Sequence, residues 1–326
     1  MKKLISLMCM LSVFALMFVG CGSSSDSGKK DGTYKVGIIQ AQQHEALDAA
    51  TKGFTDVLKE KLGDKVNITL QNAAGDSNTC GTIANQYVSG GYDLIMANAT
   101  PSLQAAVAAT GTIPIVATSV TDYATALEIS NWDGVTGINV TGTADLAPLD
   151  QQAAMIKELC PTAKTVGILY CSAEANSKYQ ATVITGHLKK LGFDVKEYTT
   201  ADSNDVAAVT TTACNDCDVI YIPTDNTMAA NKSIVDNVAG PAGVPIVTGE
   251  EGICKGCGIA TLSIDYYTIG RVAGEMAYDI LVNGENPANV EIGYSSKLTK
   301  EYVASRCEKL KITVPSDYIA IDETAE

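Results

Sequence analysis

The stretch "YKVGIIQAQQHEALDAATKGFTDVLKEKLG", residues 34–63, joins the pattern of a buried strand to that of an amphipathic helix. Residues 34–40 are rich in Val and Ile, and residues 46–63 carry apolar side chains at helical spacing. Further apolar runs follow at 66–72, 93–98, 113–118 and 135–140, with helical patterns between them. This alternation predicts an α/β fold, a parallel sheet covered by helices on both faces.

The same succession of patterns returns in the second half of the chain. The strand residues 36–38 (VGI) recur at 166–168, and the triplet Asp-Ser-Asn at 76–78 recurs at 202–204. The copies keep their order and nearly constant spacing, as an internal duplication does. We therefore predict two similar, doubly wound parallel-sheet lobes. A cleft should lie at the carboxyl ends of their strands, where loops converge on a ligand.

The composition is that of a folded, acidic protein. Of 326 residues, 46% are hydrophobic and 18% are charged, which excludes a disordered or collagen-like chain. The formal net charge is −14, so the protein repels phosphate backbones. We expect no nucleic-acid partner.

The N-terminus has the layout of a secretory signal peptide at 1–20, with a basic start and an apolar stretch too short to span a membrane. The segment 18–21, Phe-Val-Gly-Cys, resembles a bacterial lipobox, in which Cys21 is lipidated. Residues 21–32 are Ser/Gly-rich and predict a flexible tether. We expect a protein lipid-anchored at the extracytoplasmic face of the cell membrane. A plain cleaved signal peptide with a coincidental Cys is the alternative.

Several stretches are similar to those of a known family: "EALDAATKGF" (45–54), "VTGINVTGTAD" (135–145), "VGILYCSAEANS" (166–177), "IYIPTDN" (220–226) and "SIDYYTIGR" (263–271). Through them the chain resembles the substrate-binding lipoproteins of ABC importers, which have a type I periplasmic-binding fold. It most resembles the subgroup that includes tryptophan- and other aromatic amino-acid-binding members. The resemblance covers essentially the whole mature chain.

This resemblance implies how the lobes are connected and what they do. Three crossings are expected, near 142, near 265 and near 295. The expected lobes are lobe one, 33–142 plus 265–294, and lobe two, 143–264 plus 295–326. The implied function is capture of a small amino-acid-like ligand, best an aromatic amino acid, for delivery to an ABC permease. The alternatives are an extracytoplasmic sensor of the same fold, or a binder of another solute such as a nucleoside. We expect a monomer.

Candidate ligand-binding residues lie in the loops after the predicted strands and at the second crossing. They are His44, Asn98, Thr100, Thr118 and Ser119 in lobe one, Tyr170, Ser172, Glu174, Asn176, Ser177, Asp225, Asn226 and Glu250 in lobe two, and Asp265 at the crossing. The free N–H groups of a helix beginning near Glu174 suit a ligand carboxylate, and Glu174 or Asp225 suits a ligand ammonium. Alternatively, Ser172, Glu174 and Asp225 only cap helices.

A thiol enzyme is the competing class of function. Of the two histidines, only His44 lies in a predicted cleft loop, so a Cys171–His44 pair across the cleft is the conceivable nucleophile and base. The sequence has no G-x-S-x-G, P-loop or H-E-x-x-H motif. We therefore expect a binding protein with no catalytic residue, cofactor or metal.

The ten cysteines include Cys9 in the signal peptide and the lipidation candidate Cys21. Two C-x-x-C pairs, 214–217 and 254–257, precede predicted strands at the end opposite the cleft. They are interpreted as free thiols with the role of small apolar residues. Disulfides or a structural metal site stay open as alternatives.

Overall fold

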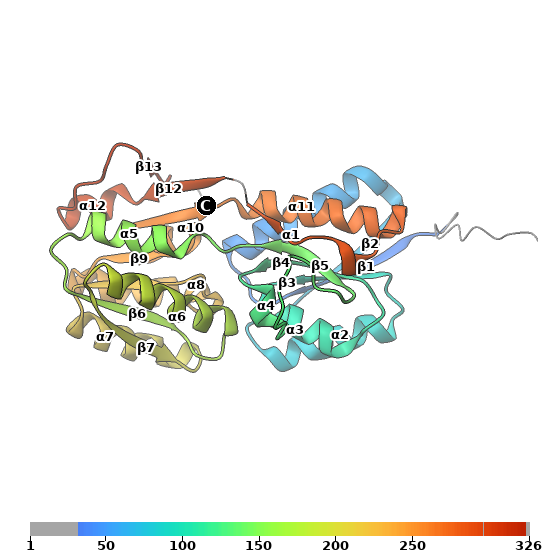
Figure 1. Cartoon of the computed structure of the whole chain (residues 1–326), viewed down its shortest axis with the longest axis horizontal. Helices are drawn as coiled ribbons and strands as arrows, with labels where there is room; N and C mark the ends of the chain where they lie inside the picture. The colour runs from blue at the N-terminus through green and yellow to red at the C-terminus, as the bar shows by residue number, and fades with distance from the viewer. Residues whose placement is uncertain (1–31, 296, 324–326) are drawn as a thin grey trace, which may run out of the picture.

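The computed structural model describes residues 32–295 and 297–323. The expected signal peptide, Cys21 and the tether up to residue 31 lie outside the described residues. The chain forms two α/β lobes that lie side by side along its longest axis (Figure 1). No helix in the described part combines the length and the apolar character that crossing a membrane requires.

Lobe one is built on a six-stranded sheet in the order β11-β5-β4-β3-β1-β2, and all its pairings are parallel. Its strands are β1 (Tyr34–Gln40), β2 (Val66–Asn72), β3 (Leu94–Asn98), β4 (Ile115–Val120), β5 (Val140–Ala144) and β11 (Gly293–Tyr294). Its helices are α1 (Glu45–Leu62), α2 (Ser77–Ser89), α3 (Thr100–Ala109), α4 (Tyr123–Ala126) and α11 (Tyr266–Tyr278), with short turns at Gly63–Lys65, Asp279–Asn283 and Pro287–Asn289.

Lobe two repeats this plan on a seven-stranded sheet in the order β13-β12-β10-β9-β8-β6-β7. Its strands are β6 (Thr165–Cys171), β7 (Asp194–Thr200), β8 (Val219–Ile222), β9 (Ile246–Thr248), β10 (Ala260–Ile264), β12 (Leu298–Tyr302) and β13 (Ile319–Ala320). Its helices are α5 (Leu149–Leu159), α6 (Ala175–Lys190), α7 (Val206–Asp216) after the turn Ser203–Asp205, α8 (Asn226–Ala230), α9 (Lys232–Ala242), α10 (Glu251–Cys257) and α12 (Ala304–Lys309). The pairing of β10 with β12 is antiparallel, and β13 runs parallel to β12, so β12 and β13 run opposite to the other five strands.

Each sheet is buried on both faces, which explains the continuous apolar strands in the sequence. In lobe one, Ile38 packs with Phe54 of α1 on one face, while Ile39 packs with Tyr87 of α2 on the other. Full burial of a side chain such as Phe54 contributes about 1.5–3 kcal/mol. The sheet faces are therefore covered, and the partner lobe meets strand ends, loops and the helices that start there.

The chain crosses between the lobes three times. It leaves lobe one after β5, returns at Asp265 between β10 and α11, and leaves again between β11 and β12. Because β11 pairs with β5 and β12 pairs with β10, the three crossings lie together at one side of the molecule (Figure 1). The opposite edges of the sheets, β2 and β7, carry no crossing.

The strand expected at 135–140 was placed too early. The structure has β5 at Val140–Ala144, and the preceding residues form an irregular turn. Gly134 and Gly137 have φ values of 101° and 70°, which an extended strand does not allow. The hydroxyl of Thr136 donates to the carbonyl of Val140 at 2.6 Å and closes this turn.

Helix α11 is held to lobe one by unusually close contact with α1. A Cβ atom on Gly270 would lie 2.1 Å from the Ala50 carbonyl oxygen, and one on Gly53 would lie 2.2 Å from that of Tyr267. Glycines here let the two backbones touch. The helix that follows the second crossing thus becomes a rigid part of lobe one.

We expect Gly270→Ala to destabilise the protein by about 1–3 kcal/mol, because the new methyl group overpacks this contact. Gly186→Ala is the matched control, since a Cβ at this helical glycine meets nothing within 4 Å. The control should gain about 0.5–1 kcal/mol from helix propensity. Urea unfolding measures both values, and equal effects of the two substitutions would contradict the close packing.

Candidate functional site

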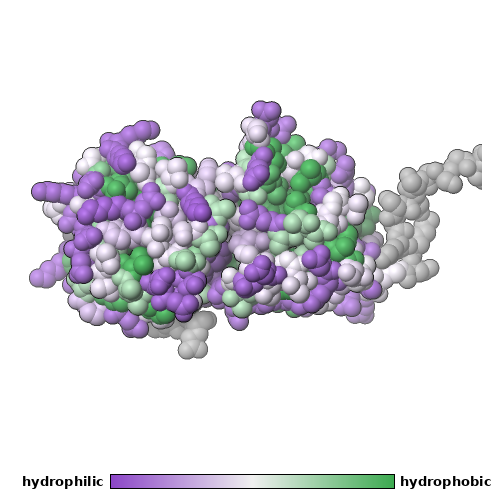
Figure 2. Space-filling model, turned by 90° about the horizontal axis from the view of Figure 1, so that it is seen from below, coloured by the Kyte–Doolittle hydropathy of each residue, from purple (hydrophilic) through white to green (hydrophobic). Residues whose placement is uncertain are grey.

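The lobes meet across the carboxyl ends of their strands in a closed arrangement. His44 Nε2 of lobe one lies 3.2 Å from Asn226 Oδ1 of lobe two. Beside it, Lys232 of lobe two forms an ion pair with Glu45 of lobe one at 2.8 Å. Helix α6 of lobe two also packs against α3 and α4 of lobe one. Seen from below, the two lobes join at a narrow waist (Figure 2).

Of the eight buried side-chain polar atoms that have no hydrogen-bond partner among the described residues, three are central to the site. They are the hydroxyls of Thr100 and Ser119 in lobe one and the side-chain oxygen of Asn176 in lobe two. All three residues are at most 7% exposed. An unsatisfied buried polar group costs about 1–3 kcal/mol, so a ligand that supplies partners would recover this free energy.

The unpartnered atoms are brought together by the fold. The Ala99 N–H donates to the Thr118 carbonyl, which places Thr100 and Ser119 on neighbouring strand ends. Gln180, one helical turn after Asn176, bonds both to the Asn176 carbonyl at 3.3 Å and to the Thr121 hydroxyl of lobe one at 3.5 Å.

Ser119 has a strained backbone as well as a lone hydroxyl. Its φ of 56° lies in the left-handed region, and the pairing of β4 with β5 shifts register between Ala117 and Val120. A non-glycine residue in this region costs about 1–3 kcal/mol and is frequent at binding sites. This irregularity changes the direction of the backbone at the end of β4.

Glu174, a predicted ammonium ligand, is engaged by the protein itself. Its carboxylate accepts hydrogen bonds from the backbone N–H groups of Asn226 and Thr227 and from the side chains of Asn176, Asn226 and Thr227. These bonds join the start of α6 to the start of α8. Glu174 therefore caps a helix 52 residues away rather than its own.

Asp225 is equally occupied. Its carboxylate accepts from the backbone N–H groups of Cys171 and Met228 and from the Ser177 hydroxyl, each at 2.7 or 2.8 Å. Burial, and then the charge of Glu174, raises the pKa of Asp225. Asp225 thus caps α8 and ties it to β6, and Ser177 serves that network.

Asp145 is a buried carboxylate that the sequence analysis did not select. It lies at the first crossing, is 3% exposed, and accepts hydrogen bonds only from the hydroxyls of Thr121 (3.1 Å) and Tyr266 (2.9 Å). Burial raises its pKa to about 6. Among the described residues it has no cationic partner, so it favours a positively charged ligand group. In the sequence, Asp145 is marked only as the last residue of the stretch "VTGINVTGTAD".

The remaining candidates have internal partners or lie away from the unpartnered atoms. Tyr170 belongs to the core of lobe two and donates to Glu197, and Ser172 donates to the Thr200 carbonyl. Asn98 donates to the Leu47 carbonyl and to Thr51 but keeps one unpartnered oxygen, and Thr118 accepts from Thr143. Glu250 caps α10, and the exposed Asp265 caps α11.

The Cys171–His44 pair has no support in the geometry. The Cys171 thiol donates to the Ala201 carbonyl at 3.4 Å, while His44 bonds to Asn226. Burial raises the pKa of Cys171, so the group is a thiol rather than the thiolate that attacks substrates.

All eight cysteines in the described part of the chain are free. No disulfide links Cys214, Cys217, Cys254 or Cys257. In the described part of the chain, no group of three or more His, Cys, Asp and Glu side chains is arranged to bind a metal ion. Burial raises the pKa of each of these four thiols. They pack as small apolar side chains.

Two pockets lie between the lobes. The mouth pocket, of about 360 Å³, is lined in lobe one by 41–42, 74–77, Cys80 and Pro101, and in lobe two by Cys171, 173–174, 201–203, 226–227 and 230–231. The acidic pocket, of about 370 Å³, is lined by Glu45, Ala46, Ala49, 250–252, 263–267, Lys297, Thr299 and Glu301.

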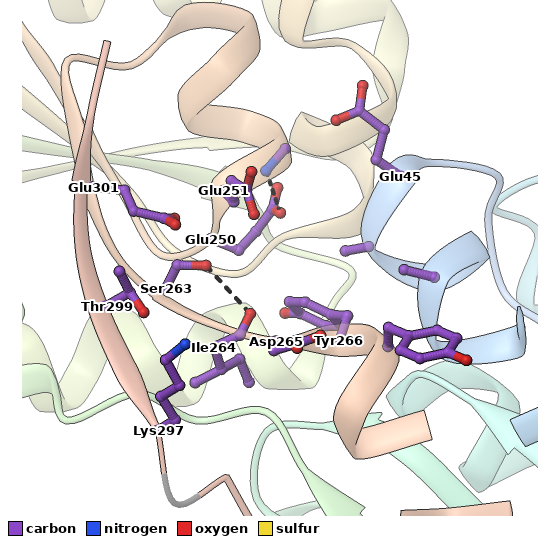
Figure 3. A pocket seen from close by; sticks show the side chains of 14 residues that line it. Glu45, Glu250, Glu251, Ser263, Ile264, Asp265, Tyr266, Lys297, Thr299 and Glu301 are labelled. Carbon is purple, nitrogen blue, oxygen red and sulfur yellow. Dashed lines mark hydrogen bonds between the residues drawn. The ribbon is translucent and has the colours of Figure 1, made fainter. Parts of the chain in front are cut away.

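The acidic pocket gathers carboxylates from both lobes and from the second crossing (Figure 3). One carboxylate oxygen of Glu301 is buried without a partner. Burial, and then the charge of Glu251, raises the pKa of Glu301 to about 7, and burial raises that of Glu250 to about 7. The charge of Glu45, the lobe-one carboxylate of this pocket, also acts to raise the pKa values of Glu250 and Glu251.

These raised pKa values predict stability that increases on mild acidification. Between the ordinary value of 4.5 and about 7, folded Glu301 and Glu250 hold more protons than the unfolded chain, so stability falls as pH rises through this window. We expect Glu301→Gln to raise Tm by about 2 °C near pH 7.5 and to flatten the dependence. Glu285→Gln, at an exposed carboxylate, is the control. Thermal melts from about pH 5.5 to about pH 7.5 test this. An unchanged slope in the Glu301 variant would contradict it.

Two α/β lobes that meet over unpartnered polar atoms are typical of two-lobed solute-binding proteins, which close around their ligands by a hinge motion. The chain belongs to the family of ABC transporter substrate binding proteins, whose model matches residues 35–322. This is a family of binding proteins, not of enzymes. The curated Tyrosine-binding protein of Clostridioides difficile (strain R20291) is 36% identical over 291 residues, covering 86% of this chain and 84% of that protein.

Solved structures agree with the fold and with the closed arrangement. The ABC domain in complex with L-Trp from Streptococcus pneumonia has a TM-score of 0.84 at 31% identity, covering 87% of this chain and 97% of that one. The ligand-free, open structure of a substrate binding protein with adhesive properties from Clostridium difficile has a TM-score of 0.67 at 34% identity, covering 89% and 100%. The open structure has the higher sequence identity to this chain but the lower TM-score. The lobes here are therefore arranged more as in the L-Trp complex.

Proposed function

We propose that this protein is the extracytoplasmic, substrate-binding component of an ABC importer and that its ligand is an amino acid, with an aromatic amino acid as the best candidate. The observation that carries the proposal is the set of buried, unpartnered polar atoms on Thr100, Ser119 and Asn176, shared between the two lobes. The names of the tyrosine-binding relative and of the L-Trp complex support the ligand class.

The charges in the cleft fit a zwitterion. Asp145 offers a buried carboxylate without a counter-ion, and a ligand ammonium would complete it with charge-assisted hydrogen bonds. The Thr100 and Ser119 hydroxyls can donate to a carboxylate, and at the start of α3 the backbone N–H groups of Thr100 and Ser102 can add to them, whereas Pro101 has no N–H. We therefore assign the ligand ammonium to Asp145 instead of to Glu174 or Asp225, the two residues expected from the sequence.

Lobe closure is the mechanism of capture. Lobe one provides the hydroxyls and lobe two provides Asn176, so only the closed arrangement offers both halves at once. A ligand shifts the equilibrium toward closure by its difference in affinity between the two states. The permease then receives a closed, loaded monomer.

Asp145→Asn should weaken amino-acid binding by about tenfold to a hundredfold, because the side chain keeps its shape but loses the charge that pairs with an ammonium. Isothermal titration with tyrosine, tryptophan and phenylalanine measures this. Asp265→Asn is the control, since Asp265 caps α11 at the exposed second crossing. We expect the control to bind as the unmodified protein does. Binding of a nucleoside or sugar with no response to any amino acid would refute the proposal.

The sequence also supports a lipid anchor at Cys21, which follows a signal-like segment. We expect Cys21→Ala to abolish incorporation of labelled fatty acid and to release the protein from the membrane fraction of the native cells. Cys80→Ala, a buried thiol of the folded part, should leave labelling unchanged. Retained labelling in the Cys21 variant would show that lipidation does not occur there.

A further inference from the structure

Two consecutive residues of lobe one contact lobe two directly, with no ligand between them. His44 is the N-cap residue of α1 and Glu45 is the first residue of that helix. His44 Nε2 lies 3.2 Å from Asn226 Oδ1, and Glu45 Oε1 lies 2.8 Å from Lys232 Nζ. Asn226 and Lys232 are the first residues of α8 and α9. One short segment of lobe one thus joins the starts of two helices of lobe two.

Asn226 is oriented within lobe two to receive His44. Its Nδ2 donates to Glu174 Oε2 at 2.6 Å. An ionised carboxylate only accepts hydrogen bonds, so this contact fixes which end of the Asn226 amide carries the hydrogens. The oxygen Oδ1 therefore faces lobe one, and His44 must donate to it from a protonated Nε2. Glu174 thereby positions the acceptor of a hydrogen bond between the lobes.

Lys232 is also held in place within its own lobe. Its stem lies against the backbone of Gly256 in α10, where a Cβ atom would lie 2.4 Å from Lys232 Cδ and 2.5 Å from its Cγ. Glycine at this position leaves the space that the lysine stem occupies, and the lysine side chain is only 22% exposed. A long side chain that is fixed in advance loses less conformational entropy when it forms an ion pair. Lobe two therefore presents a prepared cation to Glu45.

Glu45 meets like charges of lobe two beside this cation. A Cβ atom on Gly252 would lie 3.1 Å from Glu250 Oε2 and 3.3 Å from Glu45 Oε2, so the two carboxylates face the same point from opposite lobes. Glu251 lines the same pocket (Figure 3). Because Lys232 pairs with the other oxygen of Glu45, its removal would leave Glu45 beside these carboxylates without its cationic partner.

Resting on the proposed function, we propose that His44 and Glu45, with their partners Asn226 and Lys232, form a closure latch that sets how tightly every ligand is held without contacting the ligand. A contact between the lobes lowers the free energy of the closed state, so the apparent affinity of any ligand that binds this state rises. His44, selected from the sequence as a ligand-binding residue, then acts as a positioning residue. The latch also shifts the ligand-free protein toward closure, which a residue that only touches the ligand cannot do.

The hydrogen bond is tested with His44→Leu, which removes the donor, and with His44→Gln, whose side-chain amide can donate in its place. We expect His44→Leu to weaken the binding of tryptophan, tyrosine and phenylalanine by one common factor of about fivefold to fiftyfold, because closure then buries the Asn226 oxygen without a partner. His44→Gln should restore most of this loss. Isothermal titration measures the affinities, and thermal melts check that both variants fold.

The ion pair is tested with Lys232→Met, which keeps an apolar stem but removes the charge. We expect about twofold to fivefold weaker binding of each amino acid, and a much smaller effect of the same substitution in a Glu45→Gln background. Binding to the variant should also depend less on salt than binding to the unmodified protein. Lys300→Met is the matched control, since Lys300 pairs with Asp317 inside lobe two at 2.9 Å. Its affinity should stay within about twofold of that of the unmodified protein.

Small-angle X-ray scattering separates the latch from a direct contact with the ligand. Without ligand, His44→Leu should have a larger radius of gyration than the unmodified protein, while the two ligand-saturated proteins should agree. An unchanged ligand-free radius would overturn the latch and leave the proposed function standing. So would a loss of affinity that differs strongly among the three amino acids, because it reports a contact with the ligand side chain. No binding of any amino acid to the unmodified protein would instead overturn the proposed function, and the ligand-free scattering would still test the latch.

Discussion

Closing two lobes over the carboxyl ends of their strands buries polar atoms that the protein cannot satisfy by itself. Thr100 and Ser119 on one side and Asn176 on the other keep unpartnered oxygens inside the interface. A closed, empty protein therefore carries a penalty that an open one avoids by hydration. The rest of the architecture, from the sheets to the three crossings, holds these atoms in position until a ligand removes the penalty.

The buried carboxylates around the cleft fall into two groups, which differ in the groups that donate hydrogen bonds to them. Glu174, Asp225 and Glu250 accept hydrogen bonds from backbone N–H groups at helix starts, which stabilise their charges within the protein. The side-chain donors to Asp145 are two hydroxyls, and it has no cationic partner among the described residues. Carboxylates of similar burial thus have different roles, since backbone amides make a carboxylate structural whereas neutral hydroxyls leave it available to a cation.

Local patterns in the sequence predict most of the fold, because they are repeated and periodic. The strands beginning at Tyr34 and Val66 and the recurrence of Asp-Ser-Asn at 76–78 and 202–204 follow from neighbouring residues alone. The candidate site is harder to predict from the sequence. Glu174 reads as the cap of its own helix, yet its donors lie 52 and 53 residues away. Asp145 becomes a buried carboxylate only because Thr121 and Tyr266 converge on the first crossing. These are consequences of tertiary contact.

The two Asp-Ser-Asn turns, one from each lobe, line the same pocket, so the duplicated lobes meet there through equivalent loops and in an approximately symmetric way. An amino acid has no such symmetry, because its ammonium and carboxylate differ. The two lobes must therefore break their equivalence wherever they contact the ligand, and they can keep it where they contact only one another. The lobes differ where they carry unpartnered atoms, hydroxyls in lobe one and an amide in lobe two, and they stay alike in the duplicated pair of turns.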